Sequence, residues 1–141
     1  MDKRTIPNEI LLGEVAAVLQ DGREAVIIPT GNSMLPFIRG GVDRVVLRKM
    51  TAVAVGDIVL AKIGDSYILH RLIARDGDAI TLMGDGNLRG TESCRPQDIL
   101  GTVTGIIRPS GRARTPGKGR LWRILKPLRR YLLAACRRLC R

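Results

Sequence analysis

The stretch Gly31-Asn32-Ser33-Met34-Leu35-Pro36 follows an apolar run, residues 24–29, that is typical of a strand. Glycine at position 31 permits a positive φ or a close approach of the backbone, and Pro36 restricts the direction in which the chain leaves the turn. Such a turn holds the Ser33 hydroxyl in one place, which makes Ser33 a candidate nucleophile. An arbitrary serine in this kind of turn is more often a helix cap.

Beyond this turn the sequence alternates between apolar and polar residues and is rich in β-branched side chains, which predicts strands. The predicted strands cover residues 43–48, 57–63, 66–73, 79–83 and 99–107. Gly64-Asp65 predicts a two-residue hairpin turn, and Gly101 and Gly105 predict bends or bulges in the last strand. We therefore expect a mainly β fold, a small antiparallel β-barrel or coiled sheet.

One helix is predicted before the strands. Apolar residues between positions 11 and 19 recur at helical spacing, which predicts a helix over about residues 8–20 with Asn8 as its cap. Glu9 and Glu14 interrupt the apolar residues. The segment is therefore too short and too charged for a signal peptide or a spanning helix.

The net charge of +11 comes from the C-terminal part of the chain. Residues 108–141 contain twelve Lys or Arg and no Asp or Glu, whereas residues 1–107 contain twelve basic and thirteen acidic residues. The composition predicts a β domain over residues 1–107, with its body at 24–107. A basic linker at 108–120 and a basic amphipathic helix at 121–141 are expected to follow.

The predicted C-terminal helix carries apolar residues on one stripe and basic residues on the opposite side. The apolar stripe consists of Leu121, Ile124, Leu125, Leu128, Leu132, Ala135 and Leu139. Its apolar runs are too short to span a bilayer, and the pattern favours an anionic membrane surface. Docking on its own domain is the second alternative; nucleic acid, the third, is not expected as a partner. We expect a cytoplasmic protein at the inner face of the plasma membrane.

The cysteines do not form a metal-binding pattern. Cys94, Cys136 and Cys140 contain no C-x-x-C pair, and the only histidine, His70, is far from them in sequence. We therefore predict neither a zinc site nor a cofactor.

His70 lies in the predicted strand 66–73. Period two places it on the same face as Ile68 and Leu72, and places Arg71 on the other face, where it could pair with Asp57 or Asp85. Apolar surroundings lower the pKa of an imidazole and favour its neutral form, which a general base requires. A lone histidine on an apolar face is more often a core residue, so its catalytic interpretation depends on the neighbouring motifs.

Four motifs follow one another along the chain: the Ser33 turn, Val55-Gly56-Asp57-Ile58-Val59, Tyr67-Ile68-Leu69-His70-Arg71-Leu72 and Met83-Gly84-Asp85-Gly86-Asn87. Over roughly residues 25–107 this series resembles the serine peptidases of the S24/S26 type, which are grouped around type I signal peptidases and SOS-response repressors. A histidine in the base motif is similar to the endoplasmic-reticulum-type signal peptidases. There a Ser–His pair assisted by Asp replaces Ser–Lys.

The resemblance implies that Ser33 is the nucleophile, that His70 accepts its proton and that Asp85 orients the imidazole. The oxyanion would be bound by the Ser33 main-chain N–H, helped by donors near Met34 or by the Asn32 side chain. Asp85 lies in a turn-forming sequence, so an Asx turn without a catalytic part is the alternative. Glu92 is a loose candidate for a second acidic residue.

These features predict a serine endopeptidase, a hydrolase that cleaves leader, signal-like or other extended peptides after small residues such as Ala. Its expected partner is a peptide or protein substrate. The alternative is a catalytically weak member of the same fold that binds a peptide or a membrane surface. A self-cleaving repressor is not expected, because neither Ala-Gly nor Cys-Gly occurs before Ser33.

Overall fold

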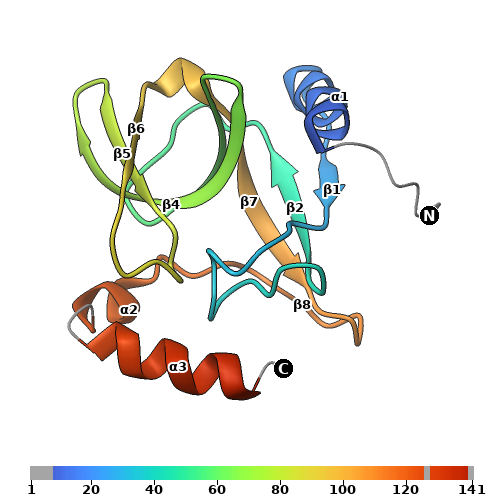
Figure 1. Cartoon of the computed structure of the whole chain (residues 1–141). Helices are drawn as coiled ribbons and strands as arrows, with labels where there is room; N and C mark the ends of the chain where they lie inside the picture. Colours follow the sequence, from blue (N-terminus) through green and yellow to red (C-terminus); the bar gives the residue numbers. More distant parts are fainter. Residues whose placement is uncertain (1–7, 126–127, 140–141) are drawn as a thin grey trace.

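One antiparallel sheet forms most of the molecule and curls on itself (Figure 1). The structure, a computed structural model, describes residues 8–125 and 128–139. The elements in chain order are α1 (Asn8–Gln20), β1 (Ala25–Ile27), β2 (Arg44–Arg48), β3 (Ile58–Ile63), β4 (Ser66–Asp76), β5 (Ala79–Met83), β6 (Glu92–Cys94), a short 3-10 helix (Pro96–Asp98), β7 (Ile99–Ile107), β8 (Ala113–Arg114), α2 (Arg120–Ile124) and α3 (Arg129–Leu139).

The sheet has the strand order β1-β2-β7-β3-β4-β5-β6, and β8 pairs with β7. β7 lies between β2 and β3, so the last long strand joins the two halves of the sheet. The pairing register shifts between Gly105 and Val103 and again between Gly101 and Ile99, which are the irregularities that the two glycines predicted. These shifts increase the local twist of the sheet and help it curl.

Two groups of buried side chains lie on the two faces of the curled sheet. The first joins α1 to β1, β2, β3 and β7 and includes Leu19 and Met34. The second consists of Val59, Ala61, Leu72, Ile80, Leu82 and Cys94, from strands β3 to β6. Leu19 is fully buried over β7, where a Cβ at Gly101 would lie only 2.9 Å from its Cδ1. The absence of a side chain at Gly101 therefore lets α1 pack closely on the sheet.

The mainly β fold, the N-terminal helix and the five longer predicted strands are confirmed. The short strands β6 and β8 were not predicted. The segment expected to be helical at 121–141 is present as two helices, α2 and α3; Pro127, which its sequence predicts to start a second helical segment or to kink the first, lies outside the described residues. None of the helices within residues 8–125 and 128–139 has the length and apolar character needed to cross a membrane.

The C-terminal helices dock on the β domain, as the second alternative for this segment anticipated. Trp122 of α2 and Leu133 of α3 are buried against Leu35, next to Phe37. Neither buried helix residue belongs to the predicted apolar stripe. Ile124, Leu128 and Leu132, which do belong to it, are exposed.

Candidate active site

Ser33 lies in a loop that closes on itself between β1 and β2. Gly31 has a φ of +79°, which an L-residue with a side chain rarely adopts. A Cβ at Gly40 would lie 1.7 Å from the Gly31 carbonyl oxygen, so the loop can close only with glycine there. The Gly41 N–H donates to the Pro29 carbonyl at 2.6 Å. The sequence prediction of a tight turn that holds Ser33 is therefore met.

A second loop, Gly84-Asp85-Gly86-Asn87, packs directly on the Ser33 main chain. The Gly86 N–H donates to the Ser33 carbonyl oxygen at 2.7 Å. A Cβ at Gly84 would lie 2.4 Å from that oxygen and 3.0 Å from Nε2 of His70. The absence of a side chain at Gly84 therefore leaves room for the Ser33 loop and the imidazole to lie close together.

His70 is positioned by the middle of β4, where it pairs with Val59 of β3. Only 8% of the residue is exposed, and burial lowers the pKa of its imidazole below the ordinary value. The negative charges of Glu92 and, more weakly, Asp85 raise the pKa, but burial is the larger effect. The imidazole is therefore held in the neutral form that a general base requires, as the sequence predicted.

Glu92 is the carboxylate next to the imidazole. Its Oε1 lies 2.5 Å from Nδ1 of His70, off the axis of the ring N–H, so the contact is not a linear hydrogen bond; it becomes an ion pair when the imidazole is protonated. Glu92 pairs with Leu82 of β5, which pairs with Leu72 of β4. Paired residues of a sheet share a face, and so do residues two apart in one strand, such as His70 and Leu72. Glu92 is therefore on the same face as His70, two strands away.

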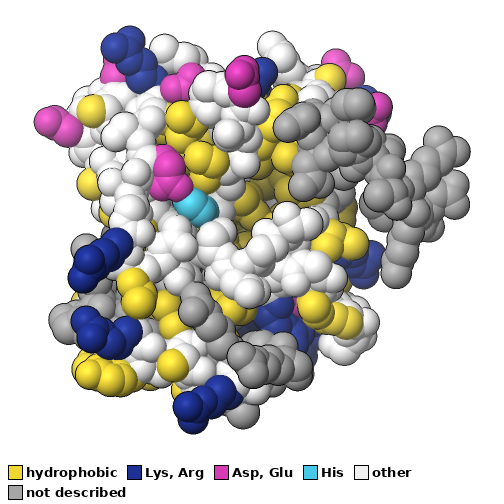
Figure 2. Space-filling view, in the orientation of Figure 1, with side chains coloured by type: hydrophobic (Ala, Val, Ile, Leu, Met, Phe, Trp, Pro, Cys, Tyr) yellow, Lys and Arg dark blue, Asp and Glu magenta, His cyan; other side chains and the backbone are white. Residues whose placement is uncertain are grey.

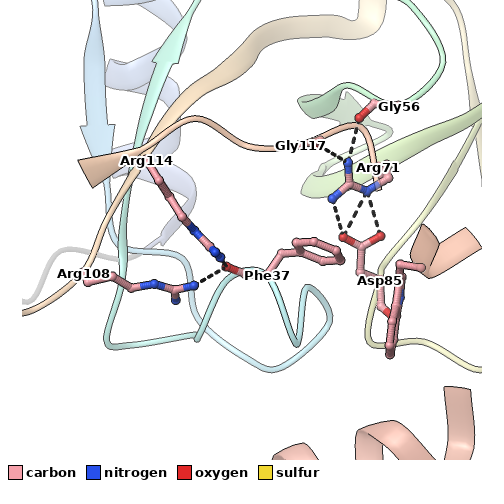
Figure 3. A network of polar contacts seen from close by, with 8 residues as sticks. Phe37, Gly56, Arg71, Asp85, Arg108, Arg114 and Gly117 are labelled. Atoms are coloured by element: carbon pink, nitrogen blue, oxygen red, sulfur yellow. Dashed lines mark hydrogen bonds and ion pairs between the residues drawn. The ribbon is translucent and has the colours of Figure 1, made fainter. Parts of the chain in front are cut away.

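Asp85, which the resemblance assigned to orienting the imidazole, is paired with Arg71. Its carboxylate accepts hydrogen bonds from Nε of Arg71 at 2.9 and 3.0 Å and from Nη2 at 2.8 Å (Figure 3). The pairing of Arg71 with Asp85, one of the two partners expected for it, is confirmed. A guanidinium binds a carboxylate more strongly than a neutral ring does, so Asp85 pairs with Arg71, and Glu92 lies against Nδ1.

Arg71 connects the site to two further segments. Its Nη1 donates to the Gly56 carbonyl and to the Gly117 carbonyl, each at 2.7 Å, and its guanidinium lies 4.9 Å from the Phe37 ring centre. The Trp122 indole N–H donates to the Asp85 main-chain oxygen at 2.8 Å. The docked C-terminal segment thus contacts both partners of the ion pair.

Ser33 and His70 both line a cleft of about 370 Å³. It is bounded by α1 through Leu12, by residues 27–31 and by residues 65–70, and Met34 and Ile38 line it with apolar atoms. In Figure 2 the chain's one histidine lies at the rim of a hollow lined by hydrophobic side chains, beside an acidic side chain. The cleft therefore offers an apolar surface ending at the two predicted catalytic side chains.

Both strands beside the cleft have unpaired edges. β1 is an edge strand of the sheet. Residues 66–70 of β4 pair with β3 only, because the pairing of β4 with β5 starts at Arg71. An extended peptide could add to such an edge through main-chain hydrogen bonds.

The two residues expected near the oxyanion differ in burial and in their position relative to the cleft. Met34 is 4% exposed and contributes to the core and to the cleft. Asn32 is exposed and is not one of the cleft-lining residues. Among the described residues, the main-chain N–H groups of Ser33 and Met34 donate to no main-chain carbonyl of a turn or loop, which favours them as oxyanion donors.

The cleft residues contain no evident metal-binding set. Within residues 8–125 and 128–139, no three His, Cys, Asp or Glu side chains gather closely enough to hold a metal ion.

A curled β domain with serine and histidine at the end of one apolar cleft points to the class of serine peptidase domains. The sequence matches the family described as Peptidase S24-like over residues 6–104, which is more than half of the chain. The chain therefore belongs to this family, within the superfamily that the four motifs indicated. A search among curated proteins found no match.

Replacing Gly84 by Ala tests the close approach of the two loops. The added Cβ would clash with the Ser33 carbonyl oxygen, so Gly84→Ala should lower the free energy of unfolding by about 1–3 kcal/mol. Chemical denaturation measures this change. In the control, Gly13→Ala, the added Cβ would have its nearest neighbour at 3.8 Å and lie in a helix, so stability should stay equal or rise. Equal behaviour of the two variants would contradict the packing described here.

Replacing Arg71 by Met tests the buried ion pair. Arg71 is fully buried and Asp85 is 2% exposed, so Arg71→Met removes the guanidinium that binds a buried carboxylate and should reduce the free energy of unfolding by about 3–5 kcal/mol. The double variant Arg71→Met/Asp85→Leu should recover part of this loss, because neither charge remains. A loss below about 1 kcal/mol for Arg71→Met would be typical of an exposed pair and would refute the assignment.

Proposed function

We propose that this protein is a serine endopeptidase in which Ser33 is the nucleophile and His70 the general base. The observation that carries the proposal is at Gly84, where a Cβ would lie 2.4 Å from the Ser33 carbonyl oxygen and 3.0 Å from Nε2 of His70, so that the Ser33 main chain and the imidazole are close together. The burial that keeps the imidazole neutral supports the same roles. Membership of the Peptidase S24-like family supports the reaction class.

In the proposed reaction, the Ser33 hydroxyl attacks the peptide carbonyl carbon while Nε2 of His70 accepts its proton. The main-chain N–H groups of Ser33 and Met34 bind the developing oxyanion. His70 then donates the proton to the leaving amine, and water hydrolyses the acyl-enzyme with His70 again acting as base. Glu92 stabilises the imidazolium that forms in each half of the reaction, because its carboxylate lies against Nδ1.

The proposed substrate is an extended leader, signal-like or similar peptide segment. The open edge at residues 66–70 and the chain at residues 27–30 both border the cleft, so a strand-like segment placed between them would pass Ser33. The apolar lining suits apolar substrate side chains. By resemblance to signal peptidases, the residue before the cleaved bond is small, such as Ala.

A second candidate is a catalytically weak member of the family that binds peptides in the same cleft. The off-axis contact between Glu92 and Nδ1 of His70 favours it, because a misaligned carboxylate orients the imidazole less well than a linear hydrogen bond does. The two candidates share the cleft and differ in whether Ser33 reacts.

Covalent labelling distinguishes the two candidates. Wild-type protein should react with a peptide-linked electrophile carrying Ala next to the reactive group, and intact mass should show one added label. Ser33→Ala and His70→Ala should remain unlabelled, whereas Ser66→Ala, a serine that also borders the cleft, should react like wild type. Unlabelled wild type over about pH 6–9, a range around the reference imidazole pKa, would remove the peptidase proposal.

The role of Glu92 has its own test in the rate of this labelling. Because burial lowers the pKa of His70, the wild-type rate should rise with pH through a midpoint below about 6.5 and then stay level. Glu92→Gln should slow the reaction by roughly 10²–10⁴-fold, since the imidazolium loses its counter-charge. The control is Glu24→Gln, whose carboxylate contacts exposed Arg48 and should not affect the rate. An equal rate for Glu92→Gln and wild type would exclude the assigned role.

A further inference from the structure

The inner face of α2 and α3 is occupied by the β domain. Trp122 is 8% exposed and Leu133 2% exposed, and both pack on Leu35. The Trp122 ring meets Phe37 edge to face with 6.2 Å between ring centres. Together with the hydrogen bond from the indole to Asp85, these contacts fix the helices on the domain.

The opposite face of α3, continued by Leu128 just before its first residue, is apolar and exposed. Leu128 is 50% exposed, Tyr131 67% and Leu132 40%, and Ala135 is also exposed. These four residues have the spacing i, i+3, i+4, i+7, so they lie on one side of a helix. We call them the outer face. Large apolar side chains gathered on one exposed surface mark an interaction site more often than singly scattered ones do.

The surroundings of the outer face carry positive charge. The chain from residue 108 to 141 contains twelve Lys or Arg and no Asp or Glu. Arg120, Arg130 and Arg138 are exposed, and the Arg130 guanidinium lies 6.0 Å from the Tyr131 ring centre. On the face drawn in Figure 2, the acidic side chains lie mainly over the strands, away from α2 and α3. A partner must therefore combine an apolar layer with negative charge.

We propose that the outer face binds the surface of an anionic lipid bilayer while the inner face stays docked on the β domain. An interfacial helix places its apolar side chains at the acyl boundary, and arginine side chains extend beside it to the headgroups. Tyr131 has the apolar ring and polar tip that favour this boundary. RNA, the other polyanion, would require aromatic side chains for base stacking, and the outer face contains only one.

Vesicle flotation with the full chain tests the proposal. Wild-type protein should float with vesicles that contain about one third phosphatidylserine, because attraction to anionic lipid adds to the apolar contact. It should not float with vesicles of pure phosphatidylcholine. The fluorescence of Trp122, the only tryptophan, should be unchanged on binding, since its ring remains buried against the β domain.

Two triple variants distinguish binding by the outer face from non-specific binding by other exposed apolar side chains. Leu128→Ser/Tyr131→Ser/Leu132→Ser should weaken binding to anionic vesicles by at least about tenfold, with the melting temperature retained because these side chains are exposed. The control Val42→Ser/Met50→Ser/Leu88→Ser removes equally exposed apolar side chains from the β domain and should bind like wild type.

Several outcomes would overturn the proposal. They are wild type that floats with neither vesicle, equal binding to neutral and anionic vesicles, and a serine triple variant that binds as tightly as wild type. A shift of the Trp122 emission would also overturn it, because the helices would then leave the domain. Binding to RNA in the absence of vesicle binding would assign the basic segment to nucleic acid.

Discussion

The ion pair between Arg71 and Asp85 is the interaction on which the rest of the site depends. It is buried on both sides and joins β4 to the Gly84–Asn87 loop, while the same guanidinium binds the carbonyls of Gly56 and Gly117. A charge left unpaired at this depth would be strongly destabilising, so all these segments are fixed together. Because Gly86 binds the Ser33 carbonyl and Gly84 adjoins the imidazole, the ion pair also determines where the two candidate catalytic groups meet.

The two carboxylates near His70 differ in their partners and therefore in their roles. Asp85 is held by a guanidinium with three hydrogen bonds and acts on the imidazole only through its more distant charge. Glu92 is about a quarter exposed and lies against Nδ1. The Gly84-Asp85-Gly86-Asn87 motif thus supplies the carboxylate that binds Arg71, and a residue beyond that motif supplies the carboxylate beside the histidine.

Much of this arrangement follows from the sequence. The long strands show clear period two, and the glycines at 31, 101 and 105 mark a turn and two irregularities that the structure contains. Glu92 could not be assigned in this way, because its approach to His70 depends on pairing across two strands, and β6 has three residues. The C-terminal segment has large apolar residues on both faces, so its pattern did not show that Trp122 and Leu133 would dock.

The most direct measurement of the central claim is an NMR titration of His70, which is simple because the chain has one histidine. The structure predicts an imidazole pKa below about 6.5 in the wild type, since burial outweighs the neighbouring carboxylates. It also predicts a further decrease in Glu92→Gln, because the charge that raises this pKa is removed. A wild-type pKa above the reference value, or one that Glu92→Gln leaves unchanged, would contradict the account.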